Sequence, residues 1–307
     1  MKRKFHLLAT IALLLHGPIV LAQVANPDLV AQAKKEGRVV WYTTVSIPES
    51  KQLIDLFEKQ YPFVKVDLLR SGAGALVNRV VSEYAARNYS ADVLQGTASR
   101  GGLTLLKKRE ILGRYESPEF KYLPAELKDK AGYWGSTFQN TFVLAYNNRN
   151  VKAADVPKTY DDLLKPIWKG RQIINDTDNF EWFDGLLKFW GKDKGLAYFR
   201  RLAAQDQIFQ RGARGRIQLV AAGEAPLAIG YGPHAQSFVN QGAPIEWVAL
   251  EPVVVIVNTV SLASKAPHPA AAKLFIDFLL SKPAQLKLRE LSRIPSRGDV
   301  EADPPRL

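Results

Sequence analysis

Two kinds of apolar pattern alternate along this chain, and their order constrains the fold more than any other feature. Short apolar segments at 39–42, 64–68 and 91–94 have the length and the spacing of strands. A helical spacing of apolar residues follows the second of them, from Leu76 to Tyr84. Repeated strand–helix units predict an α/β fold, in which a mostly parallel sheet has helices on both faces.

The second half of the chain repeats this pattern. Its predicted strands are 141–146, 171–175, 227–229, 245–250 and 253–260, and its predicted helices are 180–190, 194–204, 216–223, 268–281 and 283–291. The longest apolar run, 252–257, is expected to be a buried strand. The segment 301–307 contains two prolines and is expected to fray. Two successive series of strand–helix units in 307 residues indicate two lobes.

The first 22 residues have the layout of a secretory signal peptide. Three basic residues at 2–4 precede an apolar run at 7–15, and small or apolar residues lead to Ala22. A membrane anchor is the alternative, but the apolar run is far shorter than the ~20 residues that a transmembrane helix needs. We therefore expect cleavage after Ala22 and a free protein in the bacterial periplasm.

Composition excludes several classes of site. The chain has no cysteine, so disulfides, zinc–thiolate sites and cysteine nucleophiles cannot form. The formal charge is +12. This excess favours the attraction of an anionic ligand or simply a soluble basic surface. No motif for nucleic acid accompanies it, and we expect no nucleic-acid partner.

Catalytic motifs are scarce. Only His234 and His268 lie beyond the signal peptide, and the chain lacks a phosphate loop, a zinc-binding helix pair and a nucleophile elbow. The run Gly72-Ala73-Gly74 lacks the third glycine of a dinucleotide fingerprint and is interpreted as a tight turn.

Small polar residues instead mark the turns from strand to helix. In an open α/β sheet, ligands bind beyond the carboxyl ends of the strands, where helix N-termini favour anions. The alternative is that each hydroxyl only caps its own helix. The predicted ligand-binding residues are Tyr42, Thr43, Ser71, Gly72, Thr97, Ser99, Asp176, Thr177, Tyr231 and, as a counter-charge, Arg214.

Several segments together resemble the type II periplasmic solute-binding proteins of ABC importers, in the branch that includes ferric-ion binders. The resemblance covers nearly the whole chain after the signal peptide. It rests on the segments 40–43, 90–94, 144–147, 157–170, 266–275 and 278–281, with Gln285.

The resemblance implies two α/β lobes joined by two crossing strands, with the ligand between them. The first lobe would comprise 23–142 and 257–307, and the second 143–256. Such proteins catalyse no reaction and deliver their solute to a membrane permease that an ATPase drives. Where ferric-binding relatives have two adjacent tyrosines, this chain has Gly232 and Pro233 beside Tyr231, and Ser46 stands near the position of their histidine ligand.

These observations predict a monomeric binding protein for a small anionic or zwitterionic solute, such as a carboxylate or a phosphonate, with no cofactor and no metal site. Two alternatives remain open. One is a protein that binds ferric iron or a ferric chelate, and the other is an exported hydrolytic enzyme on an α/β scaffold.

Overall fold

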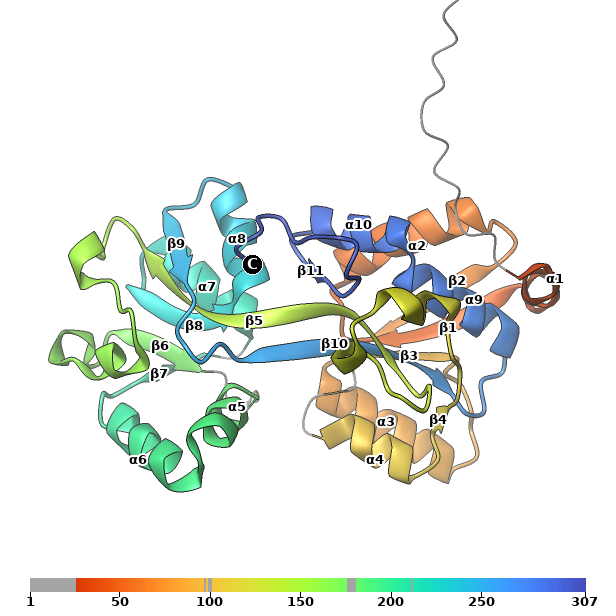
Figure 1. Ribbon diagram of the computed structural model, residues 1–307, viewed down its shortest axis with the longest axis horizontal. Helices are drawn as coiled ribbons and strands as arrows, with labels where there is room; N and C mark the ends of the chain where they lie inside the picture. The colour runs from red at the N-terminus through yellow and green to blue at the C-terminus, as the bar shows by residue number, and fades with distance from the viewer. Residues whose placement is uncertain (1–25, 97, 99–100, 176–180, 211) are drawn as a thin grey trace, which may run out of the picture.

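Two α/β lobes are joined by two long strands that belong to both (Figure 1). The computed structural model describes residues 26–96, 98, 101–175, 181–210 and 212–307. The joining strands are β5 (Gly135–Asn147) and β10 (Val255–Ala263), which pair antiparallel from Val255 opposite Thr141 to Val260 opposite Gly135. The predicted two-lobed fold with crossing strands is confirmed. The predicted boundaries at 142 and 257 fall inside β5 and β10, and we propose them as the positions of the hinge.

The first lobe is built around the strand order β2-β1-β3-β10-β5. The pairs β1–β2 and β1–β3 are parallel, whereas β10 and β5 run antiparallel because they pass through to the other lobe. Its elements are α1 (Pro27–Glu36), β1 (Arg38–Thr43), α2 (Ile47–Gln60), β2 (Lys65–Arg70), α3 (Ala73–Ala85), β3 (Val93–Gln95), α4 (Gly102–Lys108), β4 (Leu112–Gly113), the 3-10 turns η2 (Pro118–Tyr122) and η3 (Ala125–Leu127), α9 (Pro269–Leu280), α10 (Lys282–Glu290) and β11 (Ile294–Pro295).

Segments from both ends of the sequence complete the core of this lobe. Phe275 of α9 meets Trp41 of β1 and Phe57 of α2 in edge-to-face contacts, with ring centroids 5.2 and 4.9 Å apart. The carboxylate of Glu36, the last residue of α1, accepts hydrogen bonds from the backbone N–H groups of Ala270 and Ala271 in the first turn of α9. The last helices of the chain are therefore structural parts of the first lobe.

The second lobe has the order β5-β8-β6-β7, with β9 on the other side of β5. Strands β8, β6 and β7 are parallel, and its buried core includes Trp182, Tyr160 and Tyr198. Its elements are the 3-10 turns η4 (Ala153–Asp155), η5 (Tyr160–Leu164) and η6 (Pro166–Trp168), β6 (Gln172–Asn175), α5 (Glu181–Trp190), α6 (Lys192–Ala203), β7 (Ile208–Phe209), α7 (Ala213–Ala222), β8 (Leu227–Tyr231), α8 (Gly232–Asn240) and β9 (Ile245–Val248).

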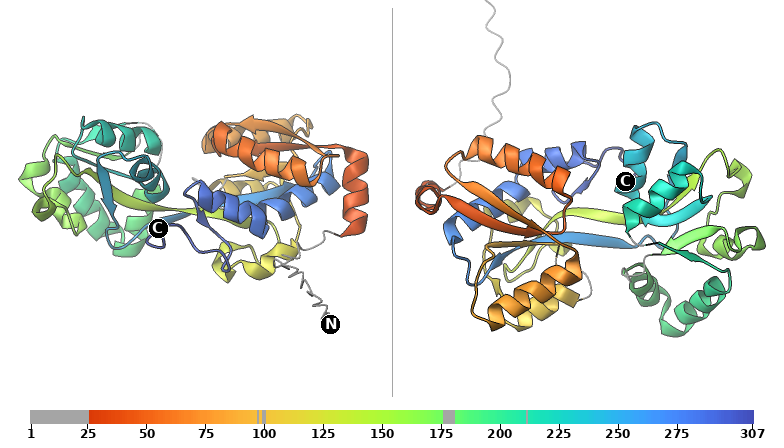
Figure 2. Two further views of the ribbon diagram at one scale, coloured as in Figure 1. Left: turned by 90° about the horizontal axis from the view of Figure 1, so that it is seen from above. Right: turned by 180° about the vertical axis from the view of Figure 1, so that it is seen from behind.

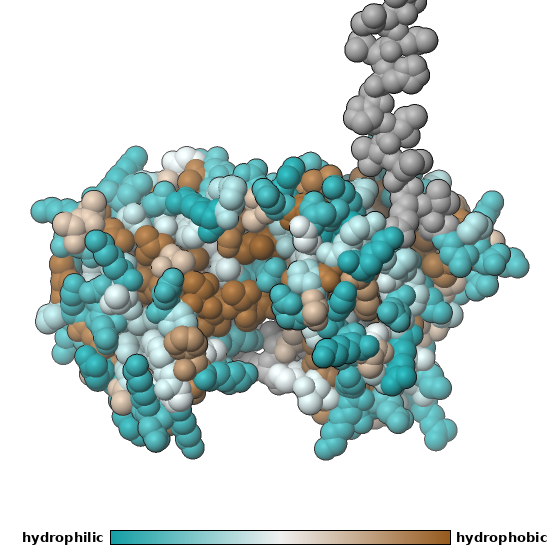
Figure 3. All heavy atoms as spheres, viewed as in Figure 1, coloured by the Kyte–Doolittle hydropathy of each residue, from teal (hydrophilic) through white to brown (hydrophobic). Residues whose placement is uncertain are grey.

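Three expectations from the sequence were wrong. The run 252–257 is not a buried strand, because β10 begins only at Val255, and Val253 and Val255 are 38% and 47% exposed where the chain passes between the lobes. Figure 3 shows hydrophobic surface over this part of the molecule. Helix α8 (Gly232–Asn240) was not among the helices predicted from the sequence. The segment 301–307 does not fray, since Arg306 and Leu307 contact the second lobe.

Asp277 of α9 generates a prediction about stability. Its carboxylate accepts hydrogen bonds from the hydroxyls of Tyr115 and Ser117, at 2.7 and 2.6 Å. Burial, opposed by these two hydrogen bonds and assisted by the negative charge of Glu119, raises the pKa of Asp277 from 3.8 to about 6. The folded state therefore holds this proton more tightly than the unfolded state, and the stability it contributes is lost as the pH rises through about 6.

We expect Asp277→Asn to remove this dependence. Between about pH 7 and pH 5 the parent protein should gain ~1 kcal/mol of unfolding free energy from this group, relative to the variant. Urea unfolding at both pH values measures the difference. Asp67→Asn, at an exposed ion pair with Arg38, is the control and should not change the slope in this range. Equal slopes in the parent and in D277N would contradict the assignment.

Candidate functional site

A cleft of 1420 Å³ lies between the two lobes and has walls from both. Its floor is formed by the crossing strands, through Phe138 and Asn140 of β5 and Ile256, Val257 and Asn258 of β10. The two further views in Figure 2 show the lobes on either side of these strands. The cleft is larger than the roughly 300–1,000 Å³ of a typical small-molecule site, as expected for an open arrangement of the lobes.

Helix N-termini form much of the wall on the first lobe. Ser46, the N-cap of α2, and Gly72, the N-cap of α3, both line the cleft, and neither makes a capping hydrogen bond with a side chain. The first backbone N–H groups of a helix have no partner within the helix and carry the positive end of its dipole. This wall therefore presents hydrogen-bond donors and positive potential to the cleft.

The second lobe faces the cleft with the beginnings of two more helices. Ala213 and Arg214 lie in the first turn of α7, and Tyr231 and His234 lie at the start of α8. Helix α5 also begins at the cleft, with Glu181, so among the described residues five helices begin there, two from the first lobe and three from the second. The arrangement suits an anionic group, which can accept hydrogen bonds from either side.

Two arginines add formal charge to the cleft. Arg70 ends β2 on the first lobe, and Arg214 belongs to α7 on the second; both are exposed and line the cleft. Neither forms an ion pair with any described residue, although the guanidinium of Arg214 stacks on the ring of Phe238 at 5.0 Å. These two side chains are therefore available to a ligand.

The pKa of His234 reflects the positive charge on the second-lobe side of the cleft. Burial, followed by the charges of Arg293, Arg214 and Arg216, lowers the pKa of His234 well below its usual value. The imidazole is therefore neutral at physiological pH. Three arginines act on it in the same direction, and this part of the cleft favours negative charge.

A buried ion pair fixes one edge of the cleft. Arg293 makes two hydrogen bonds to the carboxylate of Glu49, both 2.9 Å long, and a third to the side chain of Asn140 at 3.2 Å. Burial alone would raise the pKa of Glu49, but the charge of Arg293 and the hydrogen bond from Ser46 hold it below its usual value. Arg293 also lies 3.5 Å from Nε2 of His234, so it joins the first lobe, the floor and the second lobe.

Part of the predicted site is brought together here. Ser71, Gly72, Tyr231 and Arg214 all line the cleft, from both lobes. The predicted residues Thr97, Ser99, Asp176 and Thr177 lie outside the described residues. The ends of β2 and β8, together with the first turn of α7, thus carry the predicted positions that the structure places at the cleft.

Tyr42 and Thr43 are not part of the cleft lining. Tyr42 is buried in the core of the first lobe and donates its hydroxyl hydrogen bond to Glu83 at 3.0 Å. Thr43 is fully buried, and its hydroxyl bonds to Gln95 and to the backbone N–H of Val45. Both lie one or two residues too early, since β1 reaches Thr43 before the chain turns, and it is Thr44 that lines the cleft.

Sequence reasoning missed many charged or polar residues of the cleft, among them Arg70, His234 and Arg293. Arg70 stands directly before the predicted Ser71, and its position at a strand end could have identified it. His234 was noted only as one of two histidines. Arg293 lies beyond α10, far from the other cleft residues in the sequence, and no local pattern indicates that β11 brings it to the cleft.

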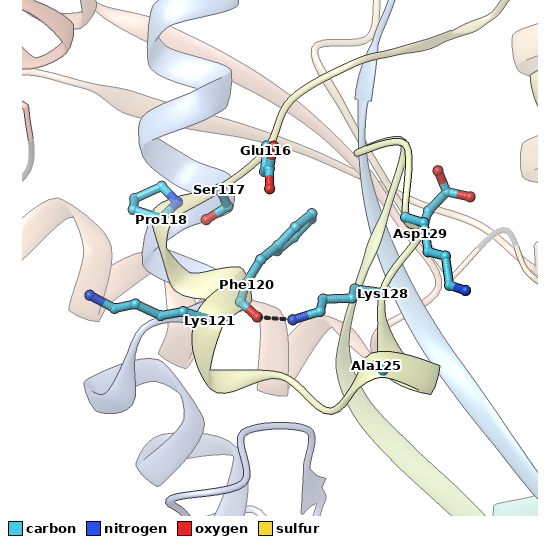
Figure 4. Close-up of a pocket in the computed structure, with 9 residues that line it drawn as sticks. Glu116, Ser117, Pro118, Phe120, Lys121, Ala125, Lys128 and Asp129 are labelled. Atoms are coloured by element: carbon cyan, nitrogen blue, oxygen red, sulfur yellow. Dashed lines mark hydrogen bonds between the residues drawn. The ribbon is translucent and has the colours of Figure 1, made fainter.

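A second, smaller pocket of 440 Å³ lies on the first lobe, at η2 and η3 (Figure 4). Its lysines do not converge. Lys128 donates to the backbone carbonyl of Phe120, while Lys121 points away from Lys128. This pocket contains no lining residue of the large cleft, and the geometry favours the cleft as the functional site.

The donors in the cleft do not form a recognisable metal centre. No cluster of three or more His, Cys, Asp or Glu side chains that could hold a metal ion occurs in the described part of the chain. Tyr231 is the single tyrosine in the described lining, and the Glu49 carboxylate is already paired with Arg293.

Comparison with known proteins agrees with this geometry. Residues 89–307 match the family described as bacterial extracellular solute-binding protein, and the chain belongs to this family. The iron uptake protein A1 of Synechocystis sp. is 28% identical over 251 residues, which cover 74% of this chain and 67% of that protein. A putative 2-aminoethylphosphonate-binding periplasmic protein of Salmonella typhimurium is 27% identical over 252 residues, with 77% and 71% covered.

Solved structures share the fold. Iron-bound HitA from Pseudomonas aeruginosa aligns with a TM-score of 0.78 at 22% identity and covers 87% of this chain and 89% of its own. The periplasmic binding protein AfuA from Actinobacillus pleuropneumoniae, with fructose-6-phosphate bound, also gives 0.78, at 24% identity and 88% of each chain. The assignment to solute-binding proteins made from the sequence is confirmed. Within the described residues, no helix is long and apolar enough to cross a membrane.

The Glu49–Arg293 pair generates a second prediction. We expect Arg293→Leu to lower the free energy of unfolding by roughly 2–4 kcal/mol, because it leaves the mostly buried carboxylate of Glu49 without its partner. The double variant Glu49→Leu/Arg293→Leu should recover much of this loss, since no unpaired charge then remains. Chemical denaturation of the three proteins measures both steps. A double variant less stable than R293L would show that the pair itself supplies the stability.

Proposed function

We propose that this protein is the periplasmic solute-binding component of an ABC-type importer and that it captures a small anionic or zwitterionic organic solute. Export would follow cleavage of the signal peptide after Ala22, and the protein would act as a monomer that delivers its solute to an inner-membrane permease. Membership of the solute-binding family supports the general role. The relatives are binding proteins, and their names include both iron and 2-aminoethylphosphonate.

The observation that carries the choice of an anion is the pair of uncommitted arginines, one on each lobe. Arg70 lies beside the first turn of α3, and Arg214 lies in the first turn of α7. A carboxylate or phosphonate between them would gain charge-assisted hydrogen bonds and the positive ends of the helix dipoles. Closing the lobes would bring both arginines to one ligand, as in hinge closure around a solute.

We expect Arg70→Gln and Arg214→Gln each to weaken binding of the native solute at least tenfold, because a hydrogen bond to a charged group contributes ~1.5–3 kcal/mol. The solute is identified by mass spectrometry of the small molecule that co-purifies with the protein. Calorimetry with that compound, and with inorganic phosphate, 2-aminoethylphosphonate and fructose 6-phosphate, measures the affinities. Arg109→Gln and Arg149→Gln, at exposed positions outside the cleft on the first and second lobes, are the matched controls.

The result can contradict the proposal in two ways. A neutral or cationic co-purified compound would overturn the anion site. Unchanged affinity in both R70Q and R214Q would do the same, while the role as a binding protein would stand.

Iron is the second candidate, because Tyr231 lies in the cleft and one relative is named as an iron uptake protein. Ferric iron favours several charged oxygen donors. The described lining offers one tyrosine and the carboxylates of Glu49, Glu181 and Glu290, of which Glu49 and Glu290 are paired with Arg293 and Lys287. We expect titration with ferric citrate to give no strong visible charge-transfer band. A band with sub-micromolar affinity that disappears in Tyr231→Phe would establish iron as the ligand instead.

An exported hydrolase is less compatible with the cleft. Such an enzyme needs a base in hydrogen-bond contact with a nucleophile. His234 is the histidine of the described lining, and its Nε2 faces Arg293 rather than a serine or threonine hydroxyl. A screen with ester and phosphoester substrates should therefore show no turnover.

A further inference from the structure

The segment that follows β11 forms a third connection between the lobes. Arg306 donates a hydrogen bond of 2.7 Å to Glu246 of β9 and one of 3.3 Å to Gln236 of α8. Its guanidinium lies 4.4 Å from the ring centre of Trp247. Leu307 packs against the apolar core formed by α7, α8 and β9. These contacts tie the segment to the second lobe.

The same segment is anchored in the first lobe only a few residues earlier. The backbone N–H of Ser296 donates to Gln285 at 2.9 Å, and the N–H of Gly298 donates to the carbonyl of Tyr122 at 2.9 Å. Arg297 is buried and forms ion pairs with Glu119 and Asp299. Residues 301–305, which include Pro304 and Pro305, connect the two anchors.

This connection lies on the other side of the hinge from the cleft. None of residues 294–307 lines the cleft, and neither do their partners Gln236, Glu246 and Trp247. In the left view of Figure 2, the dark blue segment runs below the crossing strands, whereas the orange helices of the first lobe and the teal helices of the second lobe extend above them. A rotation about β5 and β10 that narrows the cleft must widen the opposite side. Closure therefore pulls the two anchors apart.

We propose that residues 301–307 act as a strap that stabilises the open arrangement of the lobes, with the Arg306–Glu246 contact as its releasable end. The contacts of Arg306 are made in the open state and are strained or lost on closure. Any contact made only in the open state lowers the apparent affinity for a ligand that binds the closed state. The strap thus sets the threshold for closure, and it does so whatever the solute is.

The size of the effect follows from the kinds of contact. Arg306 and Glu246 are partly exposed, with 45% and 35% of their side chains accessible, so the pair is worth little by itself, and the stacking on Trp247 adds a similar amount. Together they should change the ratio of open to closed forms by roughly three- to tenfold. A shift of this size can be measured without disturbing the fold.

The chain has no cysteine, so two introduced cysteines can be labelled selectively. The distance between the labels reports the arrangement of the lobes without any ligand. Lys108→Cys on the first lobe and Lys194→Cys on the second give two unique sites for spin labels on exposed helices, and pulsed electron resonance measures the distances between them. Arg306→Glu places two carboxylates together, and Arg306→Glu with Glu246→Arg restores opposite charges. Lys188→Glu, which breaks the exposed pair with Asp184 within the second lobe, is the control.

We expect R306E to move the ligand-free distance distribution toward shorter, more closed distances. The charge-swapped double variant should return toward the parent, and K188E should match the parent. A distribution in R306E that is unchanged or longer would overturn the proposal, and so would a double variant that remains as closed as R306E. Because no solute is added, failure here is separate from failure of the anion site.

Discussion

A chain of polar side chains holds the crossing strands to the first lobe, and the placement of the cleft depends on it. Gln95 accepts from Thr43 at 3.1 Å and donates to Thr137 at 2.8 Å, and Thr137 in turn donates to the backbone carbonyl of Asn258. All four residues are almost completely buried. Buried polar groups cost free energy unless they are paired, so this chain permits essentially one alignment of β1, β3, β5 and β10. The strand ends, and the helices that start from them, are positioned as a consequence.

Two kinds of charged side chain line the cleft. Some are paired within the protein and maintain the structure, and others are available to a ligand. Arg293 is occupied by Glu49 and Asn140 and holds one edge in place. Arg70 and Arg214 have no such partner among the described residues, and they stand beside helix N-termini on opposite lobes. If the ligand is an anion, as proposed, binding and closure favour each other, because an anion held by one wall attracts the other wall. This attraction alone would couple binding at the first lobe to closure of the second lobe.

The two-lobed fold and the cleft positions at strand ends could be predicted from local sequence patterns, because each strand and each helix has its own short-range spacing of apolar residues. Ser71, Gly72, Tyr231 and Arg214 were found in this way. Two kinds of feature were beyond their reach. Tyr42 and Thr43 still belong to β1 and are buried in the first lobe, whereas Thr44, the first residue after the strand, lines the cleft. Arg293 and Arg306 reach their partners through tertiary contacts between distant segments, for which no local signal exists.

The cap that Glu36 provides for α9 also sets an order of assembly. Its partners Ala270 and Ala271 lie 234 and 235 residues further along the chain. The core of the second lobe draws on residues 142–254, so it can form as soon as that stretch is available. The first lobe must wait until α9 arrives with Phe275. Contacts between such distant residues slow folding, because the entropy of closing a large loop is lost before the contacts form. An N-terminal fragment of the first lobe therefore lacks part of its hydrophobic core. The second lobe, which is inserted in the sequence of the first, can fold before it.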